Sequence, residues 1–151
     1  MNRTEDTTLR RILFVEDDPD IQTVARMALE ALGGFTVLAC NSGAEALAKV
    51  DGFIPDLVLL DVMMPGMDGP TTLEALRKRT TCREVPVIFM TAKVQAQELA
   101  FYRELGAEEV IAKPFDPMVL AERVRTIWGG LALRRRMAAV GTAASAETVE
   151  L

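Results

Sequence analysis

Acidic residues follow two short apolar runs of this sequence. Glu16, Asp17 and Asp18 come directly after one run, and Asp61 comes directly after another. If the two runs are neighbouring strands of a parallel sheet, their carboxylates meet at one edge. Carboxylates gathered there repel each other unless a cation lies among them, and oxygen ligands favour a hard cation, Mg²⁺ first and Mn²⁺ as the alternative. Taken alone, the cluster is equally well explained by a helix cap and solvated loop charges.

Two further polar residues follow apolar runs later in the chain. Thr91 offers a hydroxyl group, and Lys113 offers a compact positive charge. Either residue alone is an ordinary loop residue. Together with the two acidic groups, however, Thr91 and Lys113 follow four strands of one parallel sheet, so the whole set lies at the same edge of the sheet, which we call the rim. The set suits phosphoryl transfer. A carboxylate attacks phosphorus to form an acyl phosphate, while the cation, the lysine and the hydroxyl stabilise the phosphoryl oxygens.

The apolar runs predict five strands, at 11–15, 35–39, 57–60, 85–90 and 110–112. The third run is apolar at every position, which is typical of a strand covered on both faces. Amphipathic stretches lie between the runs. Such β-α alternation predicts an α/β fold, a doubly wound five-stranded parallel sheet of order 2-1-3-4-5 with helices on both faces, as in flavodoxin.

Capping residues mark the expected helices. Asp18 and Pro19 begin the first, which ends near Gly33, and Ser42 with Glu45 forms a capping box that begins the second. The third and fourth are expected at 71–79 and 94–105. The fifth begins at 116–117 and is expected to end at Gly129. We expect a flexible N-terminus at 1–9, one domain at 10–129, and a tail at 130–151 that is partly helical, over 131–140, and disordered over 141–151.

Composition excludes several classes of protein. The chain has 151 residues, half of them hydrophobic, a net charge of −5 and no histidine. It is too apolar for a disordered protein, too acidic for direct nucleic-acid binding, and lacks a run long enough to cross a membrane. A phosphohistidine within the chain is also excluded. Cys40 and Cys82 are expected to be reduced thiols of a cytoplasmic protein.

Four stretches resemble the motifs of the receiver domain of two-component response regulators. They are residues 12–19 (ILFVEDDP), 61–69 (DVMMPGMDG), 90–92 (MTA) and 113–115 (KPF). The second is highly specific, and the four occur in the family's order over roughly residues 11–128. The chain is similar to the single-domain, chemotaxis-type regulators of this family. With no length for an output domain, it is expected to be a stand-alone regulator or a receiver cut from a longer protein.

The resemblance implies a role for each motif residue. Asp61 would be the phosphoacceptor, and the metal ligands would be Asp61, Asp17, Glu16 through water, and the main-chain carbonyl of Met63. The phosphoryl group would be contacted by Thr91, Ala92 and Lys113. The Lys113–Pro114 peptide bond would be cis. Side chains at Met63 and Lys93 would tune dephosphorylation. Asp18 is expected to cap a helix rather than bind metal.

The function implied is signalling rather than enzymatic turnover. A partner histidine kinase or histidine phosphotransfer protein would donate the phosphoryl group, and a downstream protein would read it, with the fourth helix, fifth strand and fifth helix as the output and homodimer face. Val110 stands where the family often has an aromatic switch residue, which puts the usual threonine–aromatic coupling in doubt. Two alternatives stay open: a phosphorylation-independent scaffold of the same fold, and an aspartate-nucleophile phosphatase, which would usually carry a second Asp at the position of Met63.

Overall fold

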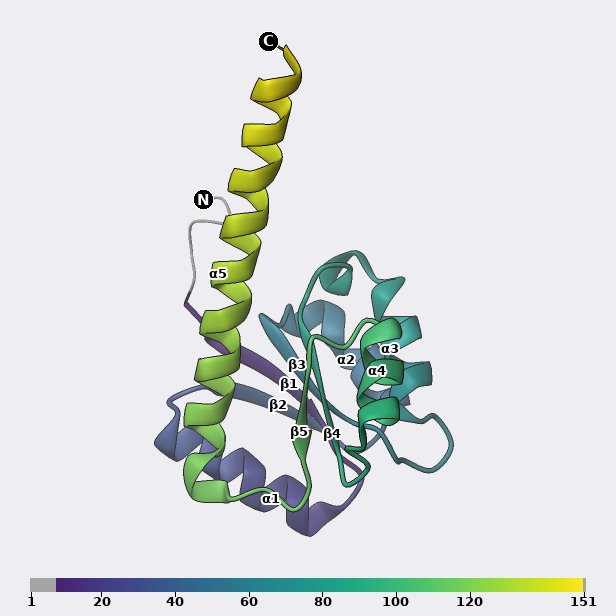
Figure 1. Ribbon diagram of the computed structural model, residues 1–151. Coiled ribbons are helices and arrows are strands. Elements are labelled where there is room, and N and C mark those ends of the chain that lie inside the picture. The colour runs from purple at the N-terminus through teal and green to yellow at the C-terminus, as the bar shows by residue number, and fades with distance from the viewer. Residues whose placement is uncertain (1–7, 151) are drawn as a thin grey trace.

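The computed structural model describes residues 8–150, with side chains up to 140, and its centre is a parallel sheet (Figure 1). The strand order is β2-β1-β3-β4-β5, which confirms the predicted doubly wound topology. The expected 1–9 segment lies mostly outside the described residues. The strands are β1 (Arg11–Val15), β2 (Thr36–Cys40), β3 (Leu57–Asp61), β4 (Val87–Thr91) and β5 (Glu109–Ala112).

Each strand is followed by helical structure. The helices are α1 (Pro19–Met27) with a π turn η1 (Ala28–Leu32), α2 (Gly43–Phe53), α3 (Gly69–Arg77) with a 3-10 turn η2 (Thr80–Cys82), α4 (Ala96–Glu104) and α5 (Pro117–Glu150). Asp18 and Ser42 accept backbone N–H bonds as the caps of α1 and α2, as predicted. The predicted α3 begins two residues late because Asp68, which caps Thr71 N, was not recognised as its N-cap.

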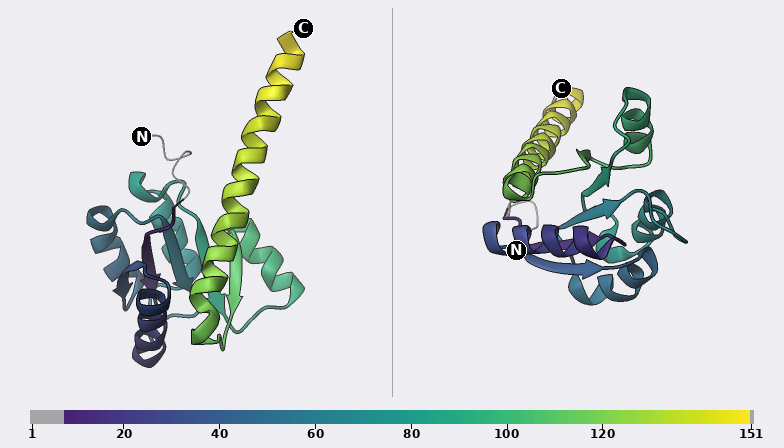
Figure 2. Two further views of the ribbon diagram at one scale, coloured as in Figure 1. Left: turned by 90° about the vertical axis from the view of Figure 1, so that its left-hand side faces the viewer. Right: turned by 90° about the horizontal axis from the view of Figure 1, so that it is seen from below.

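The two faces of the sheet bury separate apolar clusters. Alternate residues such as Leu13 and Val15 face α2, α3 and α4, whereas Ile12 and Phe14 face α1 and α5. Figure 2 shows the helices divided in this way around the sheet. Because both faces are covered, β3 is buried at all its positions, as its continuous apolar run predicts.

The predicted end of the fifth helix at Gly129 is wrong. One helix, α5, runs through both glycines, through the short helix expected at 131–140, and through most of the segment expected to be disordered, as far as Glu150 (Figure 1). Neither Gly129 nor Gly130 adopts the positive φ that ends helices at glycine. Two interior glycines cost about 2 kcal/mol relative to alanine. The next turn offsets this cost, because Leu131 is buried against the α1–α5 cluster.

Candidate functional site

Three carboxylates converge at the carboxyl ends of β1 and β3. Val15 of β1 pairs with Leu60 of β3, so the residues that follow them are level. Glu16, Asp17 and Asp61 each place a carboxylate oxygen within 4.8 Å of the others. Glu16 is 1% exposed and Asp61 4% exposed, whereas Asp17 lies further out. Three of the four acidic residues singled out in the sequence therefore form one partly buried group, whereas Asp18 caps α1.

Lys113 reaches this group from the end of β5. Its Nζ atom lies 2.6 Å from Glu16 Oε2 and 3.2 Å from Asp61 Oδ1. Burial lowers the pKa of the lysine, but the hydrogen bond and charge of Glu16, followed by those of Asp61, outweigh burial and raise it. Lys113 is therefore a cation at neutral pH and partly neutralises the buried acids.

Asp61 keeps an unusually basic carboxylate despite this lysine. Burial, followed by the charge of Glu16, raises the pKa of Asp61 to about 6, although Lys113 acts in the opposite direction. A single ammonium group thus leaves the acid cluster short of positive charge. A hard cation with oxygen ligands fits this deficit, since carboxylates close together favour such an ion.

Thr91 completes the rim at the end of β4. Asp61 pairs with Met90, so Thr91 lies one residue further along the neighbouring strand. Its side chain is buried, and its Oγ1 accepts a hydrogen bond from Lys93 N at 3.0 Å, while its carbonyl accepts one from Lys113 N at 2.9 Å. The neighbouring Ala92 is exposed in the loop.

Comparison with known proteins identifies this arrangement. Residues 12–125 match the family described as the response regulator receiver domain. The chain belongs to this family. The cis Lys113–Pro114 peptide bond expected from the resemblance is present. No helix within residues 8–150 combines the length and the apolar character that crossing a membrane requires.

Curated relatives of this receiver domain are transcriptional regulators. It is 39% identical over 116 residues to the transcriptional regulatory protein CseB of Streptomyces coelicolor, covering 77% of this chain and 48% of CseB. It is 38% identical over 120 residues to the DNA-binding response regulator MtrA of Mycolicibacterium smegmatis, covering 80% of this chain and 51% of MtrA. The receiver domain thus spans about half the length of these curated relatives.

Solved structures of receiver domains share its fold. The chemotaxis response regulator CheY4 of Vibrio cholerae, crystallised at low pH, superposes with a TM-score of 0.74 at 26% identity, covering 80% of this chain and 99% of that one. A putative response regulator from Chloroflexus aurantiacus gives a TM-score of 0.71 at 30% identity, covering 81% and 99%.

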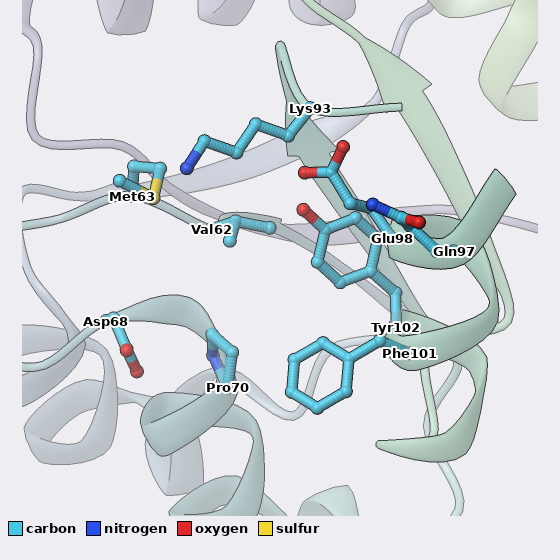
Figure 3. A pocket seen from close by; sticks show the side chains of 9 residues that line it. All are labelled: Val62, Met63, Asp68, Pro70, Lys93, Gln97, Glu98, Phe101 and Tyr102. Atoms are coloured by element: carbon cyan, nitrogen blue, oxygen red, sulfur yellow. The ribbon is translucent and has the colours of Figure 1, made fainter. Parts of the chain in front are cut away.

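Met63 and Lys93, the positions expected to tune dephosphorylation, line one hollow of about 390 Å³ (Figure 3). Met63 is 61% exposed, and its amide lies 3.4 Å from Asp61 Oδ1. Lys93 extends over the hollow in the direction of Met63 in Figure 3. The assignment of the Met63 carbonyl as a metal ligand stays a prediction. The hollow is lined by Val62, Met63, Asp68, Pro70, Lys93, Gln97, Glu98, Phe101 and Tyr102.

Sequence reasoning missed Gln22, which holds the acidic edge of the receiver domain in place. Its Nε2 atom donates to the carbonyls of Glu16 and Cys40, at 3.0 and 3.1 Å, and to Asn41 Oδ1 at 2.9 Å. Gln22 therefore ties the end of β1 to the end of β2. The signal in the sequence was a polar residue on the otherwise apolar face of α1 that includes Ile21 and Ala25.

Gly69 shapes the loop after Asp61. A Cβ atom at this position would lie 2.6 Å from the Asp61 carbonyl oxygen and 2.8 Å from Val62 Cα. The loop also turns at Gly66, whose φ is +74°. Both glycines serve the backbone, and Gly69 allows α3 to begin directly beside the phosphoacceptor candidate.

Val110, the residue at the expected switch position, is buried in β5 opposite Phe89 of β4. The ring of Phe89 meets that of Tyr102 on α4 edge to face, with centroids 5.4 Å apart. The aromatic group next to this strand pair thus comes from α4 rather than from β5.

Proposed function

We propose that this receiver domain accepts a phosphoryl group on Asp61 from a phosphohistidine of a partner histidine kinase or histidine phosphotransfer protein. The observation that carries the proposal is a buried strand-end carboxylate with two further carboxylates within 4.8 Å and an ammonium group at 3.2 Å. Acceptor, charge compensation and a metal-binding set of oxygens therefore occur at one point. The donor must be another molecule, because the chain has no histidine.

The chemistry follows from the charges at the rim. An Asp61 carboxylate oxygen attacks phosphorus, the phosphorus–nitrogen bond of the donor breaks, and the imidazole leaves. Lys113 is placed to stabilise the added negative charge because its ammonium already lies beside the attacking carboxylate. The hydroxyl of Thr91 accepts from the Lys93 amide and would donate its own proton to a phosphoryl oxygen as a second hydrogen bond, with Ala92 alongside.

A divalent cation fits the acidic edge. Glu16, Asp17 and Asp61 supply hard oxygen ligands, which suit Mg²⁺ and also Mn²⁺. When bound, the cation supplies positive charge for the phosphoryl oxygens. The residues themselves orient the acceptor, with Gln22 fixing the strand end that carries Glu16.

Signalling would proceed through protein contacts rather than turnover. The domain catalyses only its own phosphorylation and dephosphorylation, and a downstream protein reads the state of α4, β5 and the first turns of α5. CseB and MtrA are transcriptional regulators about twice as long as the matched segment. In a longer protein of that kind, this receiver domain would control the rest of the protein without contacting DNA itself.

Intact-mass spectrometry tests the proposal. Incubation with acetyl phosphate and Mg²⁺ should add the mass of one phosphoryl group, and EDTA should suppress the addition. Asp61→Asn should abolish it. Asp18→Asn is the matched control, because asparagine keeps the helix cap, and it should label like the unchanged chain. Undiminished labelling of Asp61→Asn would overturn the assignment.

A further inference from the structure

The outward face of α5 carries apolar side chains that the domain does not cover. Leu133, Met137 and Val140 are 52%, 65% and 70% exposed. Every described side chain from Leu133 to Val140 is exposed. Figures 1 and 2 show this part of α5 projecting beyond the sheet. In proteins a helix gains most of its stability from packing of an apolar face, and this part of α5 has no such packing within the domain over its described side chains.

The spacing of these residues is that of a coiled-coil seam. Alternating steps of four and three residues lead from Thr126 through Gly130, Leu133 and Met137 to Val140, and the sequence continues the pattern with Ala144. Such a repeat averages about 3.5 residues per turn and keeps one stripe facing a partner helix.

The seam points away from the receiver domain. At about 3.6 residues per turn, the stripe lies opposite the face that buries Val124, Ile127 and Leu131. Arg135, on the buried side, donates to the Glu84 carbonyl at 3.1 Å and lies 3.8 Å from Glu108 Oε1. These contacts fix the rotation of the helix, so that the apolar stripe is presented outward.

The charges beside the seam indicate what covers it. Arg134 and Arg136 flank the stripe, one on each side. In a parallel, in-register pair of identical helices, the position facing Arg134 is Gly129 and the position facing Arg136 is Gly141. The two arginines therefore meet glycines rather than like charges, and the glycines leave room for their long side chains.

We propose that the outer face of α5 binds a second copy of this chain, forming a parallel two-helix coil along residues 126–144. The interface is separate from the face of α4, β5 and α5 considered above, and the two domains lie on opposite outer sides of the coil. The seam covers fewer than three heptads, so the dimer exchanges with monomer as concentration falls.

Sedimentation velocity over a range of concentrations tests this proposal on the full chain. The unchanged chain should show a concentration-dependent monomer–dimer equilibrium. Leu133→Gln with Met137→Gln should raise the dissociation constant by about 100-fold or more, because two seam side chains lose their apolar burial. Glutamine is a good helix former, so helicity by circular dichroism should be retained. Met118→Gln and Phe101→Gln are controls at exposed apolar residues off the seam, and both should still dimerise.

Cysteine cross-linking tests the register. Leu133→Cys should form an interchain disulfide under mild oxidation, whereas Arg135→Cys, on the opposite side of α5, should not. A chain that stays monomeric at high concentration overturns the proposal. A dimer lost in Phe101→Gln but kept in the seam variant also overturns it, since the contact then runs through α4. Binding of the seam to a different protein, with no self-association, is a third contrary result.

Discussion

Lys113 and Glu16 form the shortest ion pair described at the rim, with 2.6 Å between Nζ and Oε2. The lysine lies further from Asp61, at 3.2 Å. In the absence of a divalent cation, the negative charge of Glu16, a buried candidate metal ligand, is therefore balanced mainly by Lys113.

Replacing Lys113 with methionine should destabilise the cation-free protein by about 3–5 kcal/mol, because it leaves buried carboxylates without their counter-charge. Mg²⁺ should restore much of the loss by supplying positive charge to the same oxygens. Urea unfolding with and without Mg²⁺ measures both effects. An equal loss in both conditions would contradict the view that lysine and cation compensate the same charges.

Asp61→Asn should stabilise the cation-free protein at neutral pH. The folded-state pKa of Asp61 is raised to about 6, above its unfolded value, so the folded chain binds this proton more tightly. Stability should therefore fall as pH rises from about 4 to 6 and stay reduced above that, at a cost on the order of 1–3 kcal/mol.

The asparagine variant should gain that amount at pH 7 and lose most of the gain near pH 3, below the unfolded-state pKa, where the carboxyl group is largely protonated in both states. Urea unfolding at the two pH values checks this, with the exposed Asp20→Asn as the control. A gain of the same size at both pH values would point to packing rather than charge.

Met63→Asn should shorten the lifetime of the acyl phosphate. Methionine cannot orient a water molecule, whereas a carboxamide can, and we expect dephosphorylation about tenfold faster or more. The decay of the phosphorylated mass after removal of acetyl phosphate gives the rate. Met27→Asn, at an exposed methionine of α1, should decay like the unchanged chain. An unchanged or slower decay in Met63→Asn would exclude this role.

Gln22→Leu should weaken cation binding without removing a ligand. The amide group of Gln22 holds the ends of β1 and β2. Its loss removes the side-chain donor to the Glu16 carbonyl and one of two donors to the Cys40 carbonyl, which also accepts from Glu16 N, at about 1–3 kcal/mol of stability. Glu16 then loses its fixed position, so calorimetric titration should show weaker Mg²⁺ binding. Thr23→Ala, which removes a hydroxyl bonded within α1, is the neighbouring control and should bind Mg²⁺ normally.

Gly129→Ala with Gly130→Ala should stabilise the protein by about 1–2 kcal/mol, since both positions are helical and an added Cβ meets no atom within 4 Å. Gly106→Ala should have the opposite effect, because Gly106 adopts a φ of +106°. Thermal unfolding compares the three proteins. Destabilisation by the double change would show that the helix breaks at this point in solution.

The rim was predictable because its signals are local. Asp61 ends a run that is apolar at every position, and Thr91 and Lys113 likewise follow apolar runs, so strand order alone brings them together. Gln22 was not predictable, because two of its three acceptors belong to residues 18 and 19 positions further along the chain.

The end of α5 was predicted wrongly because local sequence signals were followed. Its glycine pair favours a helix end, which is what local propensity predicts, but the burial of Leu131 lies outside that local signal. The observed strand ends differ from the predicted ones by one or two residues for a related reason. Pairing with neighbouring strands, rather than the apolar run itself, decides that β4 begins at Val87 and ends at Thr91.

The length of α5 also makes it a mechanical lever. From Leu131 to Glu150 the helix extends for about 28 Å at about 1.5 Å per residue. A tilt of about 5° at its buried base would move its far end by about 2.5 Å, a displacement as large as the separation of hydrogen-bonded atoms. Small adjustments of packing around Val124 and Ile127 are thus converted into movements that a partner at the tip can distinguish.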